Sequence, residues 1–91
     1  MVKGVLRVEY IRPGNFSDER VVKITDFKGK DYEGLFQKGH MQGDSRLVVN
    51  ILQEKGEDML IGVPHGEHCG LYGHGLDAYG FVTIKKRDLA A

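Results

Sequence analysis

The sequence predicts an all-β fold: a small antiparallel barrel of about five or six strands, with one long glycine-rich loop before the last strand. Short segments of alternating apolar and polar residues recur along the chain between turn-forming residues, as is typical of strands. No window of roughly 11–18 residues has the apolar spacing of an amphipathic helix. Residues 1–91 have the size of one domain, and closure into a barrel removes exposed sheet edges. A small β-sandwich is the alternative arrangement.

The first predicted strand covers residues 2–11. Its apolar residues alternate with charged ones, so that Val2, Leu6, Val8 and Tyr10 share one face. A proline–glycine turn follows directly and ends the strand.

Residues 19–27 and 32–37 are predicted to form the next two strands as a hairpin. Gly29 lies in the turn between them and is suited to a positive φ. Gly34 lies inside the third strand, where an isolated glycine predicts a bulge or a sharp bend.

The segment from Val22 to Gly34 resembles a hairpin of Sm-like RNA-binding barrels. In that family, too, an apolar-alternating strand precedes a glycine turn and a strand with glycine near its start. The family's Asp-x-x-Met-Asn signature is not present, because Gln37 to Gly43 reads QKGHMQG. The resemblance fits a barrel of SH3-like or Sm-like size, and no family site residue is carried over.

Three further strands are predicted in the second half of the chain. Residues 46–53 are nearly continuously apolar, which favours a central, buried strand. Residues 59–63 would return from a charged hairpin loop. Residues 81–86 form the last strand, with Val82 and Ile84 facing the core.

The segment between the last two strands, residues 62–80, has an unusual composition. It holds six of the thirteen glycines, three of the four histidines and the only cysteine. A connection this long in a small domain is typically functional or forms an interface. We therefore expect a ligand or partner surface on this loop, made by residues with polar rings, namely His65, His68, Tyr72, His74 and Tyr79.

Histidine and cysteine in the same loop also suggest a metal site as an alternative. Imidazole and thiolate ligands suit Zn²⁺ or a similar transition metal, and His65, His68, Cys69 and His74 would complete a tetrahedral set. Adjacent side chains such as His68 and Cys69 tend to diverge, which argues against this site. The same cluster would be the centre of a metal-dependent or Cys-dependent enzyme. The favoured interpretation expects no cofactor and no catalytic residue.

Basic residues suggest a second alternative, a barrel that binds single-stranded nucleic acid. The formal net charge is zero, so any such surface must be local. Its phosphate contacts would be Lys28, Lys30, Lys85, Lys86 and Arg87, with Tyr32 and Phe36 stacking on bases. The other interpretation of Tyr32 and Phe36, which we favour, places them in the core or at the rim of the barrel.

The favoured hypothesis is a non-catalytic binding or interaction module. A neutral chain is poorly protected from association by charge repulsion, so we expect a homo-oligomer, with another protein as the alternative partner. One cysteine fits a reducing compartment. The sequence has neither a signal-peptide pattern nor an apolar stretch of membrane-spanning length, so we expect a cytoplasmic protein without a membrane partner.

Overall fold

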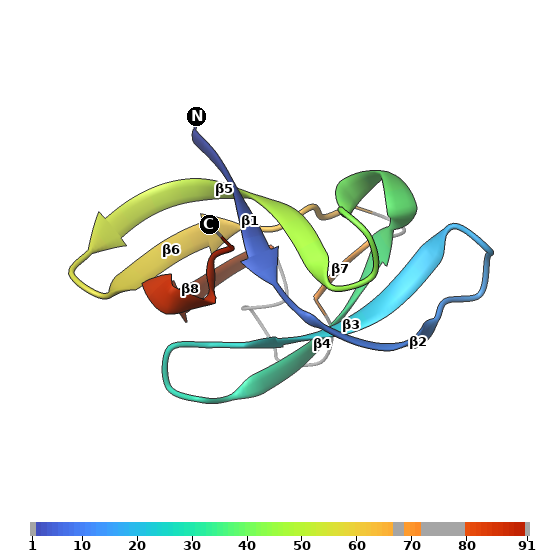
Figure 1. The fold of residues 1–91 in the computed structure, drawn as a ribbon, viewed down its shortest axis with the longest axis horizontal. Helices are drawn as coiled ribbons and strands as arrows, with labels where there is room; N and C mark the ends of the chain where they lie inside the picture. Colours follow the sequence, from blue (N-terminus) through green and yellow to red (C-terminus); the bar gives the residue numbers. More distant parts are fainter. Residues whose placement is uncertain (1, 67–68, 72–79, 91) are drawn as a thin grey trace.

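The computed structural model describes residues 2–66, 69–71 and 80–90, and this part of the chain is all-β (Figure 1). The first sheet has the strand order β1-β5-β6-β8 and the second has the order β2-β3-β4-β7. Every strand pair is antiparallel. The elements are β1 (Val2–Arg7), β2 (Glu9–Pro13), β3 (Glu19–Thr25), β4 (Asp31–Gln37), the 3-10 helix η1 (Lys38–His40), β5 (Arg46–Lys55), β6 (Asp58–Gly62), β7 (Gly70–Leu71), β8 (Phe81–Lys85) and the 3-10 helix η3 (Lys86–Asp88).

The all-β class is confirmed, but two four-stranded sheets correspond to the sandwich alternative rather than to a closed barrel. The physical reason lies at Val8, where the predicted first strand divides. The amide of Val8 does not take part in the strand pairing of either sheet. It donates instead to the carbonyl of Ser45 at 2.9 Å. As a result β1 pairs with β5 in the first sheet, while β2 pairs with β3 in the second.

One core lies between the two sheets and draws on both. Alternation places one face of most strands inside, as predicted for Val82 and Ile84, which are both buried, whereas every residue of β2 is exposed. Each such side chain contributes roughly 1.5–3 kcal/mol when fully buried. The largest fully buried side chains are Phe36, Leu6, Ile24, Leu47, Met59, Ile61, Ile84, Val22 and Val49.

Gly34 makes room for this core rather than forming the predicted bulge. The register of β3 and β4 runs without a shift through the pair Val22 and Gly34. A Cβ on Gly34 would lie 2.5 Å from the ring of Phe36, closer than two carbon atoms can pack. Glycine is therefore required here for the ring of Phe36 to lie across β4.

The C-terminal segment returns to the opposite edge of the first sheet. After η3, Leu89 forms a bridge with Leu6, and the amide of Ala90 donates to the carbonyl of Val5 at 2.7 Å. The guanidinium of Arg7 donates to the carbonyl of Arg87 at 3.0 Å. These contacts cover the β1 edge, which would otherwise offer unpaired backbone groups.

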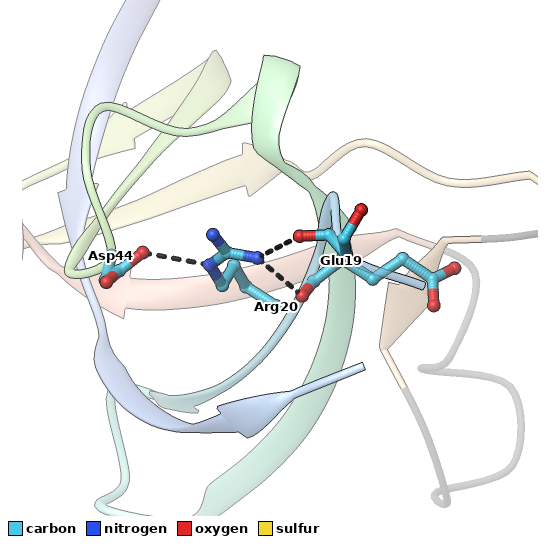
Figure 2. Close-up of polar contacts among 4 residues, drawn as sticks. Glu19, Arg20 and Asp44 are labelled. Atoms are coloured by element: carbon cyan, nitrogen blue, oxygen red, sulfur yellow. Dashed lines mark hydrogen bonds and ion pairs between the residues drawn. The ribbon is translucent and has the colours of Figure 1, made fainter. Parts of the chain in front are cut away.

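Arg20 holds together the end of the second sheet that is farther from the β3–β4 turn. Figure 2 shows its guanidinium between Asp44, which accepts at 3.0 Å, and the backbone carbonyl of Glu19, which accepts at 2.9 Å. The carboxylate of Glu19 is buried and accepts from the amide of Phe16 at 3.0 Å. The polar side chains at this end of the molecule therefore stabilise the fold.

No helix within the described ranges is long and apolar enough to cross a membrane.

Candidate functional site: a groove where the two sheets meet

The turn between β3 and β4 is held by hydrogen bonds of the Asp26 carboxylate and of the backbone. The carboxylate of Asp26 accepts from the amides of Lys28 and Lys30 at 2.9 and 2.8 Å, and the amide of Asp26 donates to the carbonyl of Lys30 at 2.8 Å. Gly29 completes the turn with a φ of 86°, a conformation that glycine adopts without strain. The turn is therefore positioned by its own backbone and does not depend on its lysine side chains.

This turn lies against the edge of the first sheet. The amide of Phe27 donates to the carbonyl of Thr83 in β8 at 2.9 Å. Thr83 belongs to the other sheet and is 56 positions farther along the chain. The bond thus brings together two segments whose proximity the sequence does not reveal.

Two adjoining hollows lie at this junction, with volumes of about 240 and 490 Å³. Phe27, Leu60 and Thr83 line both of them. We call the combined feature the aromatic groove; its principal lining residues are Phe27, Tyr32, Leu60, Leu71, Phe81 and Thr83.

The aromatic residues of the groove differ in exposure. Phe81 is 52% exposed, although it belongs to a strand, and Phe27 is half-buried. Tyr32 is buried and forms part of the floor, with its hydroxyl 3.4 Å from the carboxylate of Asp26. Phe81 and Phe27 are therefore the rings most accessible to a bound molecule.

One face of β8 presents a row of different side chains. Val82 and Ile84 are buried in the core, so alternation places Phe81, Thr83 and Lys85 on the other face. The row combines an aromatic ring, a hydroxyl group and an ammonium group along one edge strand.

Ammonium groups border the groove. The Nζ atom of Lys28 lies 5.5 Å from the ring centroid of Phe27, and that of Lys30 lies 5.5 Å from the ring centroid of Tyr32. Both distances are those of cation–π contacts. Lys55 lines the larger hollow together with Asp58. The structure therefore places Lys28 and Lys30 close to the strand that carries Lys85.

The remaining basic residues, Lys86 and Arg87, lie beyond the end of β8. Together with Lys85, Gly56 and Glu57 they line a hollow of about 380 Å³ beside the β5–β6 turn.

Of the predicted loop surface, the described residues contain only His65. Its ring is exposed and lies near Phe81, with centroids 6.2 Å apart, and its Nδ1 is 3.3 Å from the carbonyl oxygen of Val63. His68, Tyr72, His74 and Tyr79 lie outside the described residues. The loop surface therefore stays a prediction, except that His65 packs beside the groove.

The predicted metal site stays a prediction for the same reason. His65 and Cys69 are described, whereas His68 and His74 are not. In the described ranges no group of three or more His, Cys, Asp or Glu residues is arranged to hold a metal ion.

The Cys-dependent alternative likewise stays a prediction, since the structure describes only His65 and Cys69 of its cluster. Burial raises the pKa of the Cys69 thiol, and a thiol with a raised pKa has less of the reactive thiolate at neutral pH. Its backbone is tied into the loop, since its carbonyl accepts from the amide of Gly66 at 3.0 Å. Cys69 therefore resembles a structural cysteine.

The stacking role predicted for Tyr32 and Phe36 is wrong, and their alternative placement in the core is confirmed, because both rings are buried. Phe36 is completely buried, because it points from β4 into the core, and it cannot stack on a ligand. Phe27 and Phe81 occupy the accessible positions instead. The alternation of β8 contained a signal for Phe81, since a strand with Val82 and Ile84 inside must turn Phe81 outward.

Neither a protein-family model, nor a curated protein, nor a solved structure matches this chain.

Proposed function

We propose that the protein is a non-catalytic binding module that holds a single-stranded nucleic acid in the aromatic groove. The observation that carries the proposal is the hydrogen bond between Phe27 and Thr83. It brings a turn with two lysines beside a strand that presents Phe81 and Lys85. Accessible rings and ammonium groups are the two components of single-strand binding surfaces.

The rings account for contact with bases. Base–aromatic stacking is worth about 1–3 kcal/mol per base and tolerates any sequence. Phe81 is exposed enough to stack without rearrangement of the core. The Lys28 ammonium group lies over the ring of Phe27. A base that stacks on this ring displaces the ammonium group, which can then contact a neighbouring phosphate. A duplex does not offer its base faces in this way, so the proposal is specific to unpaired strands.

The local charge supports an anionic ligand, although the net charge is zero. Lys55 lines the groove, and Lys28, Lys30 and Lys85 lie beside it and would contact the phosphates at its rim. The carboxylates that line the groove are Asp26 and Asp58. Asp26 already accepts two backbone amides, which disperses part of its charge.

Self-association is a separate proposal that the neutral charge supports. Its predicted contact surface on residues 62–80 falls largely outside the described residues. Light scattering during the titration described below measures the oligomeric state directly. If a second copy or another protein occupies the groove, the oligonucleotide will not bind there. A cytoplasmic location is likewise proposed, on the single cysteine.

Fluorescence anisotropy with a labelled oligothymidylate or oligouridylate tests the proposed function. We expect binding that weakens with salt. For three or four phosphate contacts, the slope of log K against log salt concentration is roughly −2 to −3. A hairpin duplex of equal length should compete poorly. Failure to bind at low ionic strength, or equal binding of duplex and single strand, would overturn the proposal.

A further inference from the structure

A hollow lined by three basic residues lies just beyond the aromatic groove. Lys85, Lys86 and Arg87 line it together with Gly56 and Glu57, and its volume is about 380 Å³. We call it the basic pocket. Three consecutive basic residues on a strand end are often a solvated edge, but here they border one hollow.

The backbone of the basic pocket is held on both sides. The amide of Lys86 donates to the carbonyl of Glu57 at 2.7 Å, and the carbonyl of Arg87 accepts from the guanidinium of Arg7 at 3.0 Å. Gly56 forms the facing turn with a φ of 63°. A fixed backbone reduces the entropy that is lost when a ligand orders the side chains.

The lining of the pocket carries three basic side chains and one carboxylate, Glu57. Lys86 lies 3.7 Å from Glu54 in an exposed ion pair, and such pairs contribute little. Among the described residues, no carboxylate lies within ion-pair distance of the Nζ of Lys85 or the guanidinium of Arg87. Three carboxylates surround this lining: Glu54, Asp58, which is opposite Lys85 in the register of β6 and β8, and Asp88, which follows Arg87 in η3.

The basic pocket continues the line of the aromatic groove. Lys85 is two residues beyond Thr83 on the same face of β8, which is about 7 Å along the strand. A strand that stacks on Phe81 and follows β8 therefore reaches Lys85, Lys86 and Arg87.

We infer that the basic pocket binds the terminal phosphate monoester of the strand held in the aromatic groove; this inference rests on the proposed function. A phosphate monoester carries about −1.5 to −2 charges at neutral pH, whereas a backbone diester carries one. Three clustered cations suit the higher charge. Arg87 adds a planar guanidinium, which recognises phosphate by two parallel hydrogen bonds.

Three oligothymidylates of equal length test the inference: one with two hydroxyl ends, one with a 5′-phosphate and one with a 3′-phosphate. We expect one phosphorylated strand to bind about tenfold more tightly than the unphosphorylated strand, a difference typical of charge-assisted hydrogen bonds. Arg87→Gln should remove this advantage, so that the phosphorylated and unphosphorylated strands bind the variant with equal affinity. Lys38→Gln, at an exposed lysine of η1, is the matched control and should keep the advantage.

The outcomes separate this inference from the proposed function. Equal binding of all three strands, with no effect of Arg87→Gln, would overturn the inference and leave groove binding intact. No binding of any strand would overturn both. A separate titration with inorganic phosphate follows the amide resonances of Gly56 and Arg87. If these resonances shift while the phosphorylated strands have no advantage, the pocket binds free phosphate and the strand-end inference is wrong.

Discussion

The amide of Phe27 donates a hydrogen bond of 2.9 Å to the carbonyl of Thr83. This contact joins the end of the second sheet to the edge strand of the first, and it places Lys28 and Lys30 beside the exposed face of β8. The proposed binding surface depends on this junction, because neither sheet alone carries both the turn lysines and Phe81.

Replacing Phe81 with alanine should weaken binding of single-stranded oligonucleotides. The loss of one stacking contact costs about 1–3 kcal/mol, which is roughly a 5- to 150-fold change in Kd. The folded state should lose little stability, since Phe81 is 52% exposed. Phe16→Ala is the matched control, because Phe16 is also exposed but lies in the β2–β3 turn. Anisotropy titration measures both; equal effects of the two changes would argue against the groove.

Replacing Lys28 and Lys30 together with glutamine should make binding less sensitive to salt. Each phosphate contact removed changes the slope by about 0.7, so the double variant should be less steep by about 1.4. The turn should keep its shape, since the carboxylate of Asp26 holds the backbone amides of these residues and not their side chains. Lys38→Gln should retain the original slope. A double variant with an unchanged slope would place the phosphates elsewhere.

Gly80→Ala should destabilise the fold by about 1–3 kcal/mol. Gly80 has a φ of 94°, and an added Cβ would lie 2.6 Å from the Nδ1 of His65. His65→Ala in the same chain should restore part of the loss, by removing the clash but not the backbone strain. Gly39→Ala is the control, since an added Cβ there meets nothing within 4 Å. Urea unfolding measures the stability of the wild type, Gly80→Ala, the double variant and Gly39→Ala. Equal stability of Gly80→Ala and Gly39→Ala would contradict the packing of His65 over Gly80.

The ion pairs of Lys23 should stabilise the protein up to high pH. The hydrogen bond to Glu9, and then the negative charges of Asp31 and Glu9, raise the pKa of Lys23 above its ordinary 10.5. Its contribution is therefore complete below pH 10.5 and is lost as the pH rises through the higher folded-state value. As the pH rises from 10.5 through the folded-state pKa, the free energy of unfolding of Lys23→Gln should fall less than that of the wild type. Urea unfolding at increasing pH measures this difference. Identical pH profiles would contradict the ion pairs.

Cys69 should react slowly with iodoacetamide in the folded protein. Burial raises the pKa of its thiol, which lowers the fraction of thiolate at neutral pH. The rate of alkylation, followed by mass spectrometry, should rise when urea unfolds the chain at the same pH. Faster alkylation in the folded state would instead support an activated nucleophile and with it the Cys-dependent alternative.

The sequence predicted most strands correctly because their alternation is a local property. The last strand is an example: Val82 and Ile84 are inside, and the strand ends at Lys85, one residue from the predicted end. The break at Val8 was not predictable in this way. The apolar pattern of residues 2–11 continues through Val8, and only the pairing with two different sheets divides the strand.

The candidate site was predicted only in part. Clustered lysines are visible in the sequence, but the junction of Phe27 with Thr83 is a long-range contact that no local pattern encodes. Tyr32 and Phe36 could be assigned to the core or to stacking, since a strand with a central glycine shows which residues alternate but not which face is inside. The two-residue strand β7 is also too short to produce a periodic signal.

A titration of the ¹⁵N-labelled protein with a short single-stranded oligonucleotide, followed by amide chemical shifts, shows whether the aromatic groove binds single strands. We expect shifts at Phe27, Lys28, Phe81, Thr83 and Lys85, with none in the β2–β3 turn, residues 14–18. Shifts confined to other surfaces, or an unchanged spectrum at saturating oligonucleotide and low salt, would contradict the proposed binding.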